Sequence, residues 1–75
     1  MFNKSADGGY TDVVTIIVAQ TPRGRWGIYR KFSTGQIVLW TTHLLRRSAL
    51  REGQAEAIRF GLDVNNPEEF TFFDK

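Results

Sequence analysis

Few side chains in this sequence are combined in a way that is typical of catalysis. His43 is the single histidine and cysteine is absent, which excludes thiolate ligands and multi-histidine metal sites. Glu52 and Glu56 are four residues apart, so on a helix they would form a carboxylate pair of the kind used in general acid–base chemistry. The same spacing is more typical of a solvated helix face on which Glu56 reaches Arg59, and we favour that interpretation. We therefore expect a protein that is not an enzyme, with no metal and no cofactor.

Binding chemistry is indicated instead by residues 23–31, RGRWGIYRK, in which four basic side chains stand among aromatic and aliphatic ones. Basic residues interleaved with aromatic rings are typical of surfaces that bind phosphates and bases. The wider sequence is asymmetric: eight basic and two acidic residues lie between positions 22 and 60, whereas four acidic residues and one basic residue follow. This distribution predicts an acidic partner.

The length of 75 residues predicts one domain. A chain of this size buries only about 60% of the surface that its unfolded form exposes, and association is a common way for such a domain to gain stability. No apolar run approaches the roughly 20 residues of a membrane-spanning helix, and the first residues are polar, unlike a signal peptide. We expect a cytoplasmic protein with a flexible N-terminus over residues 1–9 and a single α+β domain over residues 10–75.

Runs of β-branched residues and the turn residues between them predict three strands, at positions 13–18, 25–32 and 36–42. Pro22 and Gly24 are typical of the first turn, and the short Ser33-Thr34-Gly35 link is typical of a hairpin. Because both links are short, these strands should form an antiparallel meander.

One helix should follow the meander, with Ser48 as its N-cap and Gly61 as its C-terminal cap. Gly53 in its middle indicates a close approach of the helix to the sheet. The tail has two interpretations, because Asn66 suits a helix start while residues 69–73 suit a strand, and we favour the strand. The predicted fold class is α+β: a three-stranded antiparallel meander, one helix and a short C-terminal strand (βββαβ).

Alternate side chains of a strand point to opposite faces, and both faces of this sheet should carry large apolar groups. One face should be buried under the helix, and its predicted core with that helix is Val14, Ile16, Trp26, Ile28, Leu50 and Ile58. A helix of about 13 residues, roughly 20 Å long, covers one face only. The second face should therefore be covered by the phenylalanine-rich tail or, as we favour, by a partner molecule or a second copy of the chain.

Two functions are consistent with this second face. The first is a small binding protein that docks a protein partner or forms a homodimer, in the manner of a phage-type inhibitor that acts by occlusion. Its predicted partner-binding residues are Val13, Ile17, Arg25, Tyr29, Lys31, Val38 and Trp40. The alternative is a nucleic-acid-binding protein that neutralises phosphates with a basic set of side chains. That set is Arg23, Arg25, Lys31, Arg46, Arg47 and Arg51.

The pattern from position 26 to position 61 resembles the YegP-like family of small bacterial proteins. The residues that carry the resemblance are Trp26, Ile28, Gly35, Gln36, Ile37, Val38, Ser48, Ala49 and Gly53. The family implies a ββαβ-type fold and no activity. Thr34 stands where that pattern usually has asparagine.

The same stretch is similar to the arm-site DNA-binding domain of tyrosine-type phage integrases, in which a three-stranded sheet enters the major groove with one helix behind it. That resemblance implies that Arg25, Tyr29, Lys31 and Trp40 face DNA. In size and composition the chain is also similar to small phage-encoded inhibitors such as anti-CRISPR proteins.

Overall fold

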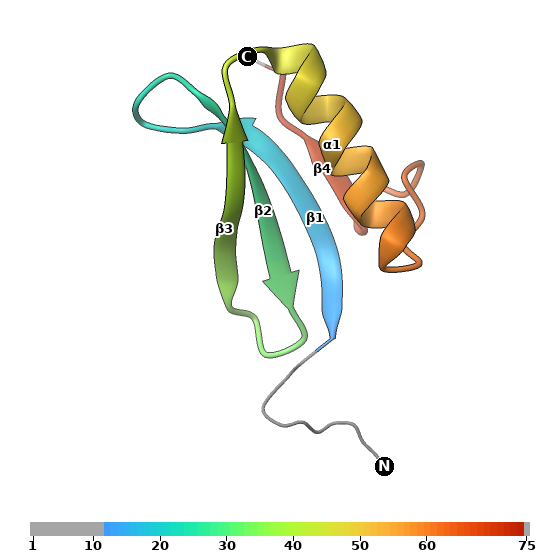
Figure 1. Ribbon diagram of the computed structural model, residues 1–75. Helices are drawn as coiled ribbons and strands as arrows, with labels where there is room; N and C mark the ends of the chain where they lie inside the picture. The colour runs from blue at the N-terminus through green and yellow to red at the C-terminus, as the bar shows by residue number, and fades with distance from the viewer. Residues whose placement is uncertain (1–11, 75) are drawn as a thin grey trace.

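The computed structural model describes residues 12–74, which form one sheet and one helix. The elements follow in the order β1 (Val13–Gln20), β2 (Trp26–Phe32), β3 (Ile37–His43), α1 (Arg46–Arg59) and β4 (Phe70–Phe72). The strand order in the sheet is β3-β2-β1-β4, and α1 packs against one side of it (Figure 1). The predicted α+β fold with βββαβ order is confirmed. The flexible segment predicted for residues 1–9 lies outside the described residues.

Two tight turns set the register of the meander. In the first, the Gly24 N–H donates to the Thr21 carbonyl oxygen at 2.9 Å, and Gly24 has a φ of 86°. Pro22 at the second position and glycine at the fourth are typical of a type I turn. In the second, the Gly35 N–H donates to the Phe32 carbonyl oxygen at 2.8 Å, and Gly35 has a φ of 93°. Both turns need a left-handed residue, which glycine adopts without strain.

The C-terminal segment adds a strand at the edge of the sheet opposite to β3. β4 pairs in parallel with β1, so Phe70 lies opposite Ile16 and Phe72 lies opposite Val18. The Ile16 N–H also donates to the Glu69 carbonyl oxygen at 2.9 Å. The tail is therefore a strand, as predicted, and it extends the sheet instead of folding over the face away from α1.

The start of α1 differs from the prediction. The N-cap position is Leu45, which makes no side-chain capping hydrogen bond, and Ser48 lies within the first turn. The predicted Ser48 cap is therefore wrong. The connection from the end of β3 at His43 to the helix is only two residues long, so the helix begins before the serine is reached.

The end of α1 agrees with the prediction. Gly61 has a φ of 75° and its N–H donates to the Ile58 carbonyl oxygen at 3.0 Å. The Leu62 N–H donates to the Ala57 carbonyl oxygen at 2.8 Å. These two bonds form a Schellman motif, in which the last carbonyl groups of the helix are satisfied by the chain that follows.

The core lies between α1 and the sheet and consists of Ile16, Val18, Trp26, Ile28, Ala49, Ala57 and Phe70. Leu50, which we expected in the core, is only partly buried against it. Two other residues of the predicted set are outside the core, because Val14 is 37% exposed and Ile58 is 66% exposed. Val14 lies at a register shift of β1, and Ile58 lies on the side of α1 that faces away from the sheet. Within residues 12–74, no helix combines the length and apolarity needed to cross a membrane.

The close approach predicted from Gly53 is confirmed. A Cβ atom at this position would overlap Cγ2 of Val18 and would lie 3.2 Å from the ring of Phe70. Val18 is fully buried and Phe70 is 7% exposed, so neither side chain has free space into which it could move. Glycine is therefore required here by the contact between helix and sheet.

We expect Gly53→Ala to lower the free energy of unfolding by about 1–3 kcal/mol, because the added methyl group overpacks the core. Helix propensity alone predicts the opposite sign, a gain of about 1 kcal/mol. Gln54→Ala, on the exposed neighbouring position, is the matched control and should be close to neutral. Urea unfolding followed by circular dichroism measures both variants. A stabilised Gly53→Ala would contradict the close contact.

The sequence suggested that Glu56 belongs to a solvated helix face. In the structure Glu56 is instead buried, with 1% of its surface exposed. Its Oε1 accepts hydrogen bonds from Nε and Nη2 of Arg30, at 3.1 and 2.7 Å. Its Oε2 lies 3.3 Å from Nη1 of Arg59, so the predicted pairing of these two residues is confirmed. Because Arg30 belongs to β2, this carboxylate ties the helix to the middle of the sheet.

Candidate functional site

The sheet has one face under α1 and one face on which no helix or strand of residues 12–74 packs (Figure 1). We call the second one the open face and assign its residues from the strand register, in which directly paired residues share a face. Ile17, Tyr29 and Leu39 lie in one row across three strands, and Lys31 lies opposite Ile37. The paired residues that lie on the open face are Thr15, Ile17, Ala19, Gly27, Tyr29, Lys31, Ile37, Leu39, Thr42 and Thr71.

β3 is the most exposed strand of the sheet. Among residues 12–74 it pairs with β2 alone, so its other edge is free. The exposed fractions of Ile37, Val38, Leu39 and Trp40 are 53%, 40%, 47% and 49%. No residue between positions 36 and 45 carries a formal charge when His43 is neutral. A free edge strand with large apolar side chains and no charge is a site at which another chain can dock.

Three of the predicted partner-binding residues do not lie on the open face. Val13 pairs with Phe32 and packs against the core, on the side of the sheet that faces α1. Val38 pairs with Arg30, whose side chain reaches Glu56 on the same side. Trp40 is the third, and its placement depends on a bulge in β3. Val13 and Val38 were assigned to the wrong face because strand parity was counted without the register that the turns and the bulges impose.

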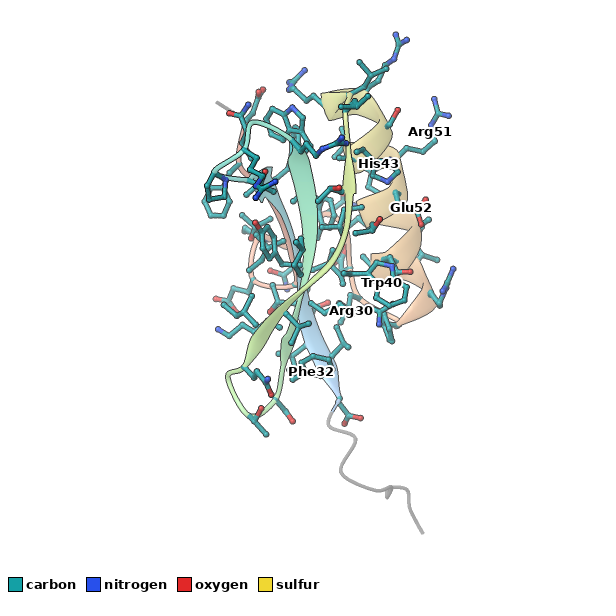
Figure 2. All side chains as sticks on the ribbon, turned by 60° about the vertical axis from the view of Figure 1, so that its left-hand side comes forward. Arg30, Phe32, Trp40, His43, Arg51 and Glu52 are labelled. Carbon is teal, nitrogen blue, oxygen red and sulfur yellow. The ribbon has the colours of Figure 1, made fainter. Side chains whose placement is uncertain are left out.

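The bulge in β3 places the Trp40 ring beside Arg30. Tyr29 pairs with Leu39 but Ile28 pairs with Thr41, which leaves Trp40 as the extra residue. The Arg30 guanidinium carbon lies 3.6 Å from the centroid of the Trp40 ring, a cation–π contact (Figure 2). Trp40 therefore lies at the rim of the sheet on the α1 side, half exposed, next to the free edge of β3.

The same guanidinium lies 5.0 Å from the centroid of the Phe60 ring. Arg30 is thus surrounded by two aromatic rings and the Glu56 carboxylate, and its side chain is only 18% exposed. Arg30 therefore stabilises the contact between helix and sheet, and its charge is not available to attract a partner.

The other predicted partner-binding residues lie where they were expected. Ile17, Tyr29 and Lys31 are on the open face and are partly buried. Arg25 lies at one end of this face, where the β1–β2 turn meets β3. Arg23, which belongs to the basic set of the nucleic-acid alternative, lies at the same end.

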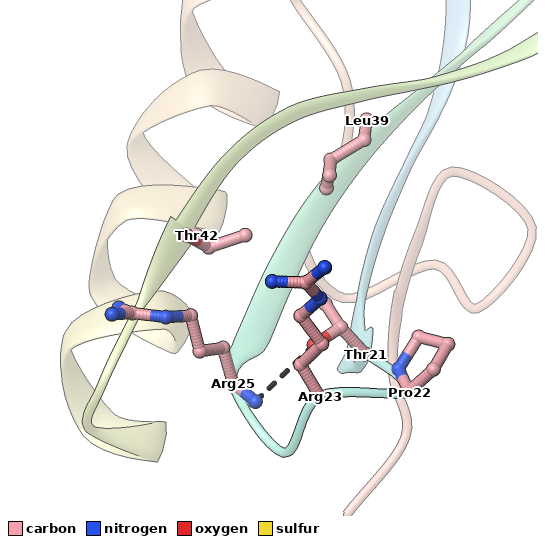
Figure 3. A pocket seen from close by; sticks show the side chains of 6 residues that line it. All are labelled: Thr21, Pro22, Arg23, Arg25, Leu39 and Thr42. Atoms are coloured by element: carbon pink, nitrogen blue, oxygen red, sulfur yellow. Dashed lines mark hydrogen bonds between the residues drawn. The ribbon is translucent and has the colours of Figure 1, made fainter.

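The two arginines line a pocket of about 420 Å³ (Figure 3). Its lining residues are Thr21, Pro22, Arg23, Arg25, Leu39 and Thr42. In Figure 3 the Arg23 guanidinium points toward Leu39, and the Arg25 side chain extends toward β3. The pocket is therefore apolar on its β3 side and basic on its turn side.

The remaining basic residues of the nucleic-acid alternative belong to α1, in the other layer of the molecule. Arg46 donates from Nε to Oδ1 of Asp74 at 2.7 Å, and its guanidinium lies 5.3 Å from the centroid of the Phe72 ring. Arg47 and Arg51 are exposed on α1. The six basic side chains thus divide between the sheet layer and the helix layer of the molecule.

Sequence reasoning missed Ile37 and Leu39 as open-face residues, and it did not identify Thr21, Pro22 and Thr42 as pocket residues. A signal for the first two was present in the Ser33–Gly35 link. A three-residue hairpin loop with glycine in third place pairs the residues on either side of it, here Phe32 with Gln36. Counting back from that pair places Leu39 opposite Tyr29. The pocket has no comparable signal, because the bulge in β3 decides where Thr42 lies.

The residues considered for catalysis do not come together. Glu56 is engaged by two arginines, and His43 lies on β3 opposite Trp26, on the α1 side of the sheet, with its Nε2 atom buried and without a hydrogen-bond partner among residues 12–74. No cluster of three or more potential metal ligands occurs in that same part of the chain.

Comparisons of this chain with protein-family models, with curated proteins and with solved structures gave no match. The resemblances to the YegP-like family and to the integrase arm-site domain therefore stay predictions.

Proposed function

We propose that this protein is a non-catalytic binding protein that docks a protein partner on the open face of its sheet and along the free edge of β3. The observation that carries the proposal is the exposure of four consecutive apolar side chains, Ile37 to Trp40, on an edge strand without charged residues. A domain that covers part of its partner in this way can act by occlusion alone.

The charge of the open face favours a different, acidic protein over a second copy of this chain. Arg23, Arg25 and Lys31 lie on or beside this face, and none of them forms an ion pair within residues 12–74. Two copies facing each other across this surface would bring like charges together, which is unfavourable in a desolvated interface. A partner with carboxylates around an apolar centre would neutralise these basic side chains and also cover the exposed apolar ones.

The double variant Ile37→Thr/Leu39→Thr should weaken partner binding by at least about tenfold, because each side chain contributes about 1.5–3 kcal/mol when it is fully buried. Threonine is β-branched, which strands favour, and at both positions it removes most of the apolar surface. The immobilised protein is used to capture partners from extracts of the cells that express it, with and without nuclease. The recovered partner is then titrated against each variant.

Ile58→Thr is the matched control, because Ile58 is even more exposed but lies on α1. It should bind like the wild type. Raising the salt concentration from about 50 to 200 mM should weaken a protein partner only modestly, whereas a nucleic acid held by about six phosphate contacts would lose about 10³-fold. A nuclease-sensitive partner with that steep dependence, retained by the double variant, would contradict the proposal and favour nucleic acid. Light scattering tests self-association. A wild-type dimer that the double variant abolishes would show that the occupant of this face is a second copy of the chain and not an acidic partner.

A further inference from the structure

The pocket at the end of the open face is built by a rigid turn. The Thr21 N–H donates to the Arg25 carbonyl oxygen at 2.7 Å, and the Arg25 N–H donates to Oγ1 of Thr21 at 3.2 Å. Nε2 of Gln20 also donates to the Gly24 carbonyl oxygen at 3.3 Å. The backbone that carries Arg23 and Arg25 is thus held in place from both sides, so their side chains start from fixed positions.

The floor beside this turn is closely packed. Gly27 is buried on the open face, and a Cβ atom there would lie 2.9–3.1 Å from the side chains of Thr21, Leu39 and Tyr29. The absence of a side chain at Gly27 lets these three groups come together beneath the pocket. Leu39, which packs here and is still 47% exposed, forms an apolar wall that a partner's side chain can contact.

The two guanidinium groups have no carboxylate partner among residues 12–74, although three ion pairs occur elsewhere in that part of the chain. None of the six lining residues is acidic. A guanidinium donates several hydrogen bonds in a planar arrangement that matches a carboxylate, and such charge-assisted bonds are about twice as strong as neutral ones. The pocket thus combines an apolar wall with two unused donors of the type that carboxylates bind.

We propose that this pocket binds a glutamate or aspartate side chain of the protein partner, presented by an extended segment that lies along β3. The inference rests on the proposed function and specifies the chemistry of the partner. Leu39 lines the pocket and also belongs to the exposed run on β3. A strand that pairs with the free edge of β3 can therefore place its carboxylate between Arg23 and Arg25 and its apolar side chains over Leu39 and Ile37.

The test uses the full protein labelled with ¹⁵N and titrated with the acetylated, amidated pentapeptide Val-Thr-Glu-Thr-Val, in which the glutamate and both valines point to the same face of an extended chain. We expect it to shift the Nε signals of Arg23 and Arg25 and the amide signals of Leu39 and Thr42. The same peptide with glutamine in place of glutamate should bind at least about tenfold more weakly, since it loses hydrogen bonds to charged groups. Phenylacetate, a free carboxylate with an apolar ring, should bind more weakly than the glutamate peptide because it cannot pair with β3.

The variant Arg23→Gln/Arg25→Gln should abolish the preference for glutamate over glutamine. Arg47→Gln/Arg51→Gln removes the same charge from α1 and should keep the preference. Equal affinity for the two peptides, or an equal loss in both double variants, would overturn the inference. Tighter binding of phenylacetate than of the peptide would also overturn it, because the pocket would then serve a small molecule.

This readout is separate from that of the proposed function. Loss of the glutamate preference leaves the capture experiment with Ile37→Thr/Leu39→Thr unaffected. Conversely, a partner that still binds Ile37→Thr/Leu39→Thr would contradict the proposed function. The peptide titrations would then still measure whether the pocket prefers a carboxylate.

Discussion

Trp26→Ala should lower the free energy of unfolding by about 3–5 kcal/mol, which for a domain of this size is most of its stability. Trp26 is 7% exposed, belongs to the core, and its ring centroid lies 5.8 Å from that of Phe72. Removing the indole leaves a cavity between α1, β2 and β4 that the surrounding backbone cannot close. Urea unfolding followed by circular dichroism should show a large fraction of unfolded protein without denaturant.

The chain offers a matched control in its second tryptophan. Trp40→Ala removes the same side chain from a half-exposed position, where its main described contact is with Arg30. A cation–π contact between a half-exposed ring and a largely buried guanidinium contributes about 0.5–2 kcal/mol, so this variant should lose about 1–2 kcal/mol, less than Trp26→Ala. Two variants that unfold at the same urea concentration would contradict the assignment of one tryptophan to the core and the other to the rim.

Glu56→Ala should lower the free energy of unfolding by about 3–5 kcal/mol, because it leaves the Arg30 guanidinium without its partner. Arg30 lies beside the Trp40 and Phe60 rings with its side chain only 18% exposed, so water can replace the lost carboxylate only in part. Thermal and urea unfolding measure the loss. The variant should also loosen the end of α1, which hydrogen exchange of its amide groups detects.

Two further variants separate the buried pair from the exposed one. Arg59→Ala removes a guanidinium whose side chain is 64% exposed and should lose no more than about 1 kcal/mol. Arg30→Met/Glu56→Leu replaces both charged groups by apolar side chains and should recover most of the stability lost by Glu56→Ala. A double variant as unstable as the single one would show that the carboxylate itself, and not the unpaired guanidinium, is what the fold requires.

The location of the candidate surface could be predicted from the sequence only in part. That one face of the sheet lacks a cover follows from the number of apolar strand residues and the length of a single helix. Ile17, Tyr29 and Lys31 were assigned to this face correctly because β2 and the second half of β1 pair without interruption. Val38 and Trp40 were not, because hairpin register and a bulge shift the parity of β3 relative to its neighbour.

The sequence by itself determined the order of the elements, both tight turns, the end of α1 at Gly61 and the close approach at Gly53. The order follows from the hydrophobic pattern and the turn residues. The two turns, the helix end and the close approach each depend on a glycine, the residue that adopts a left-handed turn or a contact without Cβ at no cost.

Only the tertiary structure decided the parallel position of β4, the burial of Glu56, the side of the sheet on which Trp40 lies, and the pocket between Arg23 and Arg25. These features depend on groups far apart in the chain. Glu56 is buried because Arg30, 26 residues away, neutralises it, and Trp40 turns toward α1 because the bulge lets its ring meet the same guanidinium. No local sequence pattern predicts these features, because the contacts that stabilise them form only when the sheet and the helix pack together.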